Sequence, residues 1–297
     1  MSILSQIDKL REQAEHSTLS LPALMIKSEK IADNIIHGEH AKRKSGSGEK
    51  FWQFREYDQS DRPQDIDWRQ SAKGDQVFIK QKEWQITRKA FLWCAGGKSM
   101  DYASKTEYFT KQESAQIITL SIALLLRKAK DQIGIFGKTQ TGRSEETINK
   151  IANFLYKKPE LDEYLPSEHN LTLPRNAYFI GVGDFLSPIE KIESCFKSLN
   201  NQTQNSLIIQ TLDPAELDLN YTGRIRFKGI DDTQEIVNHV SSIRDEYNKR
   251  INSHIESIKS LCHFYGWNYV LHVTNNDIED TLRDVWEVMS EGKYQQT

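Results

Sequence analysis

The sequence predicts an α/β protein: a mostly parallel β-sheet with helices on both faces, joined to an N-terminal segment of helix and β-structure. From about residue 88 onward, apolar strand-like runs alternate with longer helix-like segments, the order typical of parallel strands joined by crossover helices. Several of these runs, such as AYFIGVGDF at 177–185, are continuously apolar, as strands buried on both faces are. We therefore expect a helical and β region over residues 1–87 and an α/β domain over residues 88–297.

The N-terminal region contains one helix candidate, residues 1–37. Pro22 suits a helix start, apolar residues recur on one face, and Gly38 follows as a stop signal. The polar run KRKSGSGEK at 42–50 predicts a loop. Two strand-like runs, QVFIKQ and EWQITRKAF, come after it.

The α/β domain should alternate strand and helix to its end. The expected strands are 88–94, 133–137, 177–185, 206–212, 225–229 and 268–273. The expected helices are 107–130, 145–157 capped by Ser144, 188–200, 233–264, and a last helix begun by a capping box of Asn276 and Glu279. Parallel sheets bind ligands beyond the carboxyl ends of their strands. The loops at 95–100, 138–144 and 183–187 should therefore meet in one site.

The composition is that of a soluble globular protein. The formal net charge is −3 and the isoelectric point about 6.3, so no overall field attracts nucleic acid or a membrane. The longest apolar segment, residues 117–126, is too short to span a bilayer. The three cysteines lie far apart, which suggests a reducing compartment. We expect a cytoplasmic protein with no membrane span and no nucleic-acid partner.

Residues 55–72 read REYDQSDRPQDIDWRQSA, and this block resembles the signature of the domain of unknown function 58 family. Ser60 is a departure, because that family usually has Gly there. Similar segments, including GVGDFL and DPAELDLNYTGRIRF, lie in the family's order along residues 38–290. The resemblance implies a von Willebrand factor A-like (vWA-like) domain. It also implies a non-catalytic partner of a MoxR-type AAA+ ATPase, in chaperone-like maturation or activation of a client protein.

The same resemblance implies a metal-ion-dependent adhesion site, in which Asp-x-Ser-x-Ser, a later hydroxyl and a late Asp hold a magnesium-like ion. Ser99 matches the second Ser and Asp184 the late Asp, while Ser144 is a looser match for the hydroxyl. Ala95 and Gly97 replace the first Asp and the first Ser. Because Mg²⁺ needs several oxygen ligands, we expect a degenerate site with no tightly bound cofactor and at most weak Mg²⁺ binding.

Lys98 directly precedes Ser99 in this rim. Its ammonium would repel a divalent ion about 6 Å away by roughly 5 kcal/mol at an effective dielectric of about 20. One hypothesis is that Lys98 folds over the rim and pairs with Asp184, as a tethered cation in place of the ion. The alternative is that Gly96 and Gly97 form only a tight strand-to-helix turn.

The signature block has two interpretations. Its charges of both signs favour a structural network, in which Arg–carboxylate pairs lock a loop and Trp68 fills a gap in the core. The same residues could instead form a docking surface, since Trp, Tyr and Arg are common interface anchors. The residues concerned are Arg55, Tyr57, Asp61, Arg62, Asp67, Trp68 and Arg69.

The sequence carries few signs of catalysis. Its histidines are scattered, and it has neither a Gly-x-Ser-x-Gly elbow nor a phosphate-binding P-loop. We therefore expect no enzyme activity, with ATP hydrolysis left to a partner. Two alternatives stay open. One is a metal-assisted hydrolase that uses Asp184 or Asp61, and the other is a nucleic-acid-binding module built on the signature block, against which the acidic balance argues.

Overall fold

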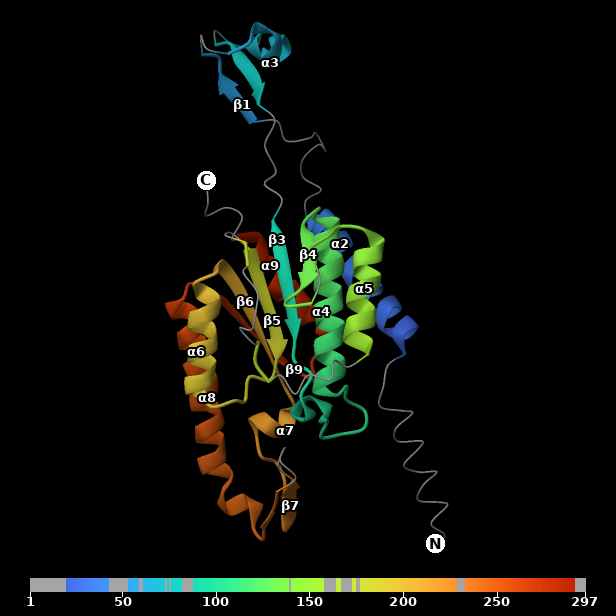
Figure 1. Ribbon diagram of the computed structural model, residues 1–297, viewed down its shortest axis with the longest axis vertical. Coiled ribbons are helices and arrows are strands. Elements are labelled where there is room, and N and C mark those ends of the chain that lie inside the picture. The colour runs from blue at the N-terminus through green and yellow to red at the C-terminus, as the bar shows by residue number, and fades with distance from the viewer. Residues whose placement is uncertain are drawn as a thin grey trace. The chain divides into compact units, whose positions relative to one another are not determined.

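A computed structural model (Figure 1) describes residues 20–42, 53–58, 61–72, 74, 76–81, 88–138, 140–157, 164–166, 173–174, 177–228 and 233–291. The chain divides into two compact units. The larger unit combines the residues up to His37 with those from Arg88 onward, and the smaller unit comprises residues 38–87. The expected division was into residues 1–87 and 88–297. The units differ from it because the N-terminal helix belongs to the larger unit, where its apolar face packs in the core.

A five-stranded parallel sheet forms the centre of the larger unit, which confirms the predicted α/β class. Its spatial order is β4-β3-β5-β6-β9. The strands are β3 (Lys89–Cys94), β4 (Gln132–Ile135), β5 (Ala177–Gly183), β6 (Thr203–Leu212) and β9 (Asn268–Val273). The first strand of this sheet, β3, thus lies between the second, β4, and the third, β5, so the direction of winding reverses between β3 and β5. Ligand sites of open α/β sheets form at such a switch point, beyond the carboxyl ends of the strands.

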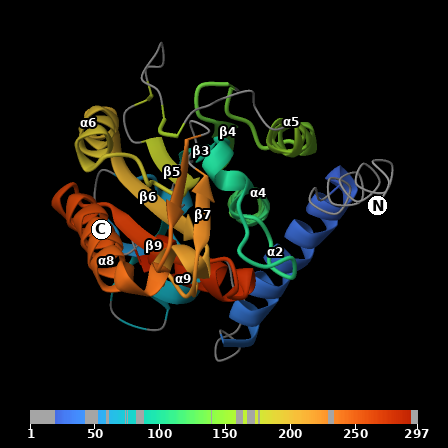
Figure 2. The same ribbon diagram turned by 90° about the horizontal axis from the view of Figure 1, so that it is seen from below.

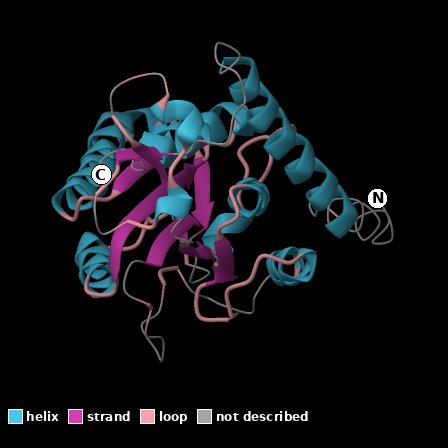
Figure 3. Cartoon of the chain, turned by 90° about the horizontal axis from the view of Figure 1, so that it is seen from above, coloured by secondary structure: helices cyan, strands magenta, loops and turns pink. Residues whose placement is uncertain are grey.

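Helices cover both faces of this sheet (Figures 1 and 2). One face carries α4 (Lys111–Lys128), α5 (Glu145–Tyr156) and α9 (Ile278–Glu291), and the other carries α6 (Ile189–Asn200) and α8 (Arg244–Phe264). Helix α2 (Leu21–Lys42) runs across the outside of α4 (Figure 2; Figure 3 shows the same helix, next to the N-terminus, from the opposite side). There the Ser28 hydroxyl donates to the carbonyl of Ile117 at 3.5 Å. The helix is therefore a third layer on this side, and α4 is buried almost all round from Lys111 to Leu126.

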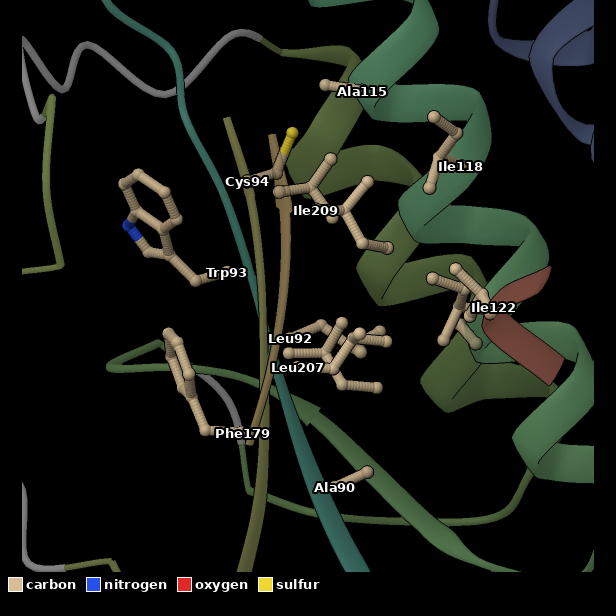
Figure 4. Packing of buried hydrophobic residues seen from close by; sticks show 14 of the residues in the cluster. Ala90, Leu92, Trp93, Cys94, Ala115, Ile118, Ile122, Phe179, Leu207 and Ile209 are labelled. Carbon is tan, nitrogen blue, oxygen red and sulfur yellow. The ribbon is translucent and has the colours of Figure 1, made fainter. Parts of the chain in front are cut away.

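The core follows from the alternation of side chains along the strands. Leu92 and Cys94 of β3 point toward α4, where they meet Ala115 and Ile118, whereas Trp93 points to the opposite face (Figure 4). The apolar runs that predicted strands buried on both faces are thus explained, because each strand contributes side chains to two packed layers. No helix among the described residues is long and apolar enough to cross a membrane.

Several predicted boundaries are wrong in detail. The helix expected over 233–264 begins at Arg244, and its first part instead forms strand β8 (Gln234–Val237), which pairs antiparallel with β7 (Ile225–Lys228). Helix α2 continues through Gly38, since one glycine costs a helix only about 1 kcal/mol.

The cap of the last helix also differs from the prediction. Asp277, and not Asn276, caps α9, because its carboxylate accepts the N–H of Glu279 at 2.9 Å.

The smaller unit is a β-hairpin-like arrangement with a short helix. Strand β1 (Gln53–Glu56) pairs antiparallel with β2 (Phe78–Gln81), and α3 (Trp68–Ser71) lies between them in the sequence. Asp67 starts α3 by accepting the N–H groups of Arg69 and Gln70. Its own N–H donates to the carbonyl of Phe78 at 2.8 Å, which ties the helix start to β2.

The buried His272 predicts acid sensitivity of the fold. Its ring is fully buried, Nδ1 contacts the Thr281 hydroxyl at 2.8 Å, and Nε2 has no partner among the described residues. Burial lowers the pKa of His272 to about 4, against a smaller opposing effect of Asp277. A lowered histidine pKa gives stability that is complete above the unfolded value of about 6.5 and is lost as the pH falls toward 4.

We expect the wild type to lose roughly 3 kcal/mol of unfolding free energy through this group between pH 7 and pH 4. Urea unfolding of wild type and His272→Gln at several pH values measures it. The variant should be less stable at pH 7 but lose less on acidification. His263→Gln, at an exposed position, should keep the wild-type dependence. An equal pH slope in wild type and His272→Gln would contradict the assignment.

Candidate functional site

The candidate site lies where the strands β3, β5 and β6 end. The backbone N–H of Ala95, just after β3, donates to the carbonyl of Val182 in β5 at 2.8 Å, so these two chain segments leave the sheet side by side. Asp184 follows β5 directly, and Glu216 belongs to the short helix α7 (Pro214–Leu217) that follows β6. The topology therefore brings both carboxylates to the switch point.

A buried lysine joins these two carboxylates. Lys111, the first residue of α4, is 0% exposed. Its Nζ donates to Asp184 Oδ2 at 3.0 Å and to Glu216 Oε1 at 2.6 Å. The side chains of Asp184 and Glu216 are 3% and 17% exposed. We call these three residues the ion cluster.

Helix starts hold the ion cluster in place from two sides. At α4, Thr110 and Glu113 form a capping box, and Lys111 N–H donates to the carbonyl of Tyr102 at 3.1 Å. At α7, Asp213 and Glu216 form a second capping box, in which Glu216 Oε2 accepts the Asp213 N–H at 2.9 Å. Glu216 thus uses one oxygen to cap its helix and the other to bind the ammonium. Each capping box is a local feature of sequence that orients a charged group of the cluster.

The turn after β5 positions Asp184. Its backbone carbonyl accepts from the Gln210 amide at 2.8 Å, and Gln210 in turn accepts from the Tyr269 hydroxyl at 2.6 Å. Phe185 has a φ of +49°, in the left-handed region that non-glycine residues seldom adopt. Its ring is buried, and its carbonyl contacts His254 Nε2 at 2.7 Å. These contacts hold the turn in a conformation that the backbone alone does not favour.

The cluster contains one cation and two anions in a largely buried environment. Burial raises the pKa of Glu216, and the nearby charge of Asp184 adds to this effect, while Lys111 and the hydrogen bond from Asp213 oppose it. The pKa of Glu216 is raised overall, because the one ammonium that opposes the effect of burial is shared between two carboxylates. Removing one member of a buried ion pair usually leaves an uncompensated charge at high cost. The three side chains therefore depend on one another.

Tyrosines line the same edge. Tyr102 and Tyr221 hydroxyls lie 2.7 Å apart, and the Tyr247 hydroxyl donates to the carbonyl of Glu216 at 2.9 Å. Burial raises the pKa of Tyr102, with further contributions from Tyr221 and the nearby carboxylates. Burial likewise raises the pKa of Tyr247 to about 12. The phenols of Tyr102 and Tyr247 therefore stay protonated near neutral pH, so they act as hydrogen-bonding groups and not as bases.

The hypothesis that Lys98 pairs with Asp184 is wrong. Lys98 opens a short 3₁₀ turn (Lys98–Asp101) and its side chain is exposed, whereas Asp184 is buried against Lys111. The physical reason is that Asp184 is buried, so an exposed side chain cannot reach it. Lys111, at the start of the buried helix α4, reaches its carboxylate from inside the fold. A tethered ammonium does occupy this position, but it comes from a different residue.

The small residues of the first loop are explained by packing, and not by the backbone freedom on which the tight-turn alternative is based, because Gly97 has φ −69° and ψ 164°, which any residue can adopt. Ala95 and Gly97 are buried. A Cβ added to Gly97 would lie 2.4 Å from the Tyr164 ring, so the small residue is required by the close approach of Tyr164. Ser99 keeps a buried hydroxyl that has no partner among the described residues.

Ser144 serves as a helix cap. Its hydroxyl accepts the N–H of Thr147 at 3.2 Å and lies 3.1 Å from the Thr147 hydroxyl. The expected cap of α5 is therefore confirmed. The contacts seen for this hydroxyl are with its own helix and not with the ion cluster.

The arrangement does not fit a magnesium ion. Mg²⁺ requires near-octahedral oxygen ligands at about 2.0–2.1 Å. Here Asp184 and Glu216 each direct an oxygen to the Lys111 ammonium, and Ala95 and Gly97 offer no side-chain ligand. The ammonium thus supplies the positive charge that a metal ion would otherwise bring to the two carboxylates.

The sequence reasoning missed Lys111 and Glu216. One signal was present: TKQE and DPAE each fit a capping box, and both boxes close in the structure. A lysine in the first turn of a long apolar helix is a second signal, because a buried ammonium needs carboxylate partners. Which carboxylates these would be follows only from the strand order.

The signature block folds within the smaller unit, and its aspartates bind backbone N–H groups. Asp67 caps α3, and the carboxylate of Asp61 accepts the N–H of Asp58 at 2.8 Å. Tyr57 N–H donates to the carbonyl of Val77 at 2.7 Å. Arg55 belongs to β1, opposite Ile79 of β2.

Three signature residues are exposed. Arg62 and Arg69 lie at the surface, and Trp68 is 68% exposed. The expectation that Trp68 fills a core gap is therefore wrong for this unit, because α3 turns its first residue outward. The docking interpretation of the block stays a prediction.

Replacing Lys111 tests the mutual dependence in the ion cluster. We expect Lys111→Met to lower the unfolding free energy by about 3–5 kcal/mol, because it leaves two buried carboxylates without a cation. Urea unfolding measures the loss. Adding Asp184→Asn and Glu216→Gln to Lys111→Met should recover part of it. The matched control is Lys150→Met, which removes an exposed lysine paired with Glu146 and should cost at most about 1 kcal/mol. A similar small loss for Lys111→Met would contradict the role of the cluster.

A methyl group at Gly97 tests the packing of the first loop. We expect Gly97→Ala to destabilise the protein by about 1–3 kcal/mol, because the new Cβ forces the Tyr164 ring to move. Thermal unfolding measures the change. Gly74→Ala is the control, since nothing lies within 4 Å of a Cβ there. Equal melting temperatures for wild type and Gly97→Ala would contradict this packing, because they would show that the loop accommodates a Cβ at position 97.

Comparison with known proteins identifies a family. No curated protein matches the chain. One similar solved structure is a mutant of the PilB minor pilin from Streptococcus sanguinis, with 13% identity and a TM-score of 0.34 over 73% of this chain and 64% of the pilin. The chain therefore spans a little under two thirds of that protein's length. A family model described as protein of unknown function DUF58 matches residues 53–257, more than half of the sequence. The chain belongs to the DUF58 family.

Proposed function

We propose that this chain is a cytoplasmic, non-catalytic binding protein that acts as an adaptor for a MoxR-type AAA+ ATPase. In this role it helps the ATPase to mature or activate a client protein in a chaperone-like way. It binds its partners through the strand-end edge of the sheet and the signature block. It does so without a metal ion, at a degenerate adhesion site.

One observation carries the metal-independent part of this proposal. The ammonium of Lys111 lies buried between Asp184 and Glu216 at the switch point of the sheet. In a metal-dependent site, an ion with an open coordination position receives a carboxylate from the partner. A buried ammonium cannot do this, because it has no face toward solvent. Binding at this edge must then depend on shape and on the surrounding side chains.

Family membership supports the partner assignment. The match covers the signature block and most of the α/β domain, residues 53–257. The resemblance to this family implies a partnership with a MoxR-type ATPase. The chain has no P-loop of its own, so ATP hydrolysis is left to that partner. A division of labour follows, in which the ATPase supplies the energy and this chain supplies a binding surface.

The two alternatives have weaker support. A metal-assisted hydrolase needs an ion at Asp184, where Lys111 already neutralises the carboxylate. A nucleic-acid-binding module would need a basic surface, and the chain has a formal net charge of −3. Asp61, the other candidate for hydrolysis, binds a backbone N–H.

A pull-down of the tagged chain from its own cell lysate, read by mass spectrometry, tests the proposal. We expect a MoxR-type ATPase to be recovered both with Mg²⁺ and with a chelator. An ATPase of this class itself binds Mg²⁺ with ATP, so calorimetry of the isolated chain with Mg²⁺ serves as the second measurement. No heat of binding up to millimolar Mg²⁺ is expected. Recovery of no ATPase would overturn the adaptor role, and binding of Mg²⁺ at millimolar or lower concentration would overturn the metal-independent site.

A further inference from the structure

The β7–β8 ribbon is an arm inserted between the sheet strand β6 and helix α8. Its two strands pair antiparallel, with Arg226 opposite Ile236 and Phe227 opposite Glu235. Figure 1 shows β7 beyond α7, on the side where the strands of the central sheet end. The ribbon therefore extends from the same edge that carries the ion cluster.

One face of this ribbon is attached to the fold. The ring of Phe227 contacts that of Tyr221 with centroids 6.5 Å apart, and the Tyr221 hydroxyl lies 2.7 Å from that of Tyr102. Arg244 fixes the chain segment that leads into β7, because its guanidinium donates to the carbonyls of Leu219 and Tyr221 at 2.8 and 2.9 Å. The arm is thus anchored to the strand-end edge through its inner face.

The other face of the ribbon is open to solvent. Side chains alternate across a strand, so Arg226 and its cross-strand neighbour Ile236 point away from the face that carries Phe227. Arg226 is exposed, as is Arg224 two positions earlier, and Ile236 is 45% exposed. Neither arginine forms an ion pair with a carboxylate in the part of the chain that the structure describes. Glu235, the acidic residue of β8, lies on the opposite face.

We propose that the outer face of the β7–β8 ribbon binds an acidic, extended segment of a protein partner. The proposal rests on the proposed function, and it adds a surface and a partner chemistry to it. Exposed arginines that form no ion pair with a carboxylate of the described residues are suited to bidentate binding of Asp or Glu. The aliphatic side chain of Ile236 beside them offers an apolar contact. An extended segment fits because its side chains alternate with the same period as those of the ribbon.

The observations favour an acidic protein segment over nucleic acid. Binding of a nucleic acid strand usually combines several phosphate contacts with aromatic rings that stack on bases. The aromatic rings here, Phe227 and Tyr221, contact each other on the inner side, and the exposed apolar residue of the outer face is Ile236. The overall acidic charge of the chain also opposes a polyanion that extends beyond the arm.

Fluorescence anisotropy of the full chain with a fluorescein-labelled peptide that alternates Glu with Thr tests the proposal. We expect saturable binding that weakens with added salt. Arg224→Gln combined with Arg226→Gln should weaken it by about tenfold, as two exposed ion pairs are lost. Ile236→Ser should weaken it severalfold without changing the charge. The matched control is Lys150→Gln combined with Arg283→Gln, which removes two positive charges from α5 and α9 and should leave binding unchanged.

Three outcomes would overturn the proposal. They are equal binding by wild type and the double arginine variant, equal binding of a peptide with Gln in place of Glu, and tighter binding of a labelled oligothymidylate than of the acidic peptide. Circular dichroism of each variant establishes that it is folded. The result is independent of the ATPase pull-down: recovery of the ATPase with no peptide binding would leave the adaptor role standing and remove only the ribbon as its surface.

Discussion

The buried ammonium of Lys111 is the interaction on which the strand-end edge depends. It connects the first turn of α4 with the turn after β5 and the short helix after β6. A cation at a helix N-terminus is opposed by the helix dipole, so Lys111 is held there by its two carboxylates and not by its helix. The same edge includes two capping boxes and the tyrosine contacts. Without the ammonium, two buried negative charges would face each other at the point where three chain segments meet.

Such a tethered cation changes how the site can be controlled. An exchangeable ion stabilises a protein according to its free concentration and its dissociation constant. Lys111 is part of the chain, so its concentration at the site is fixed. In the metal-independent site that we propose, the rim geometry does not depend on the supply of divalent ions.

The sequence predicted the central architecture because hydrophobic burial determines it locally. The run AYFIGVG could only be a strand buried on both faces, and β5 is one. The site was harder to predict because it depends on distant residues. Asp184 was recognised because it matches the late Asp of the adhesion site that the sequence resembles, but its cation lies 73 residues earlier in the sequence. Lys98, a lysine in the rim loop itself, was the simpler candidate.

The error at β8 has a different cause. Residues 233–243 have an apolar spacing that suits a helix, but Gln234–Val237 gain cross-strand partners from β7. Tertiary pairing therefore decides against the local pattern. The expected apolar face of the long helix is right from Ile251 onward, where Ile251, Ile255 and Ile258 are buried.

The order of synthesis has a consequence for helix α2. Its apolar face, with Leu24 and Ile31, is complete early, but it packs on α4, where the contact between Ser28 and Ile117 spans 89 residues. A ribosome that adds about 5–20 residues per second needs roughly 5 to 20 s to make that stretch. The smaller unit is made within this interval, between the two pieces of the larger one. The apolar face of residues 21–42 therefore has no packing partner on α4 until that helix has been made.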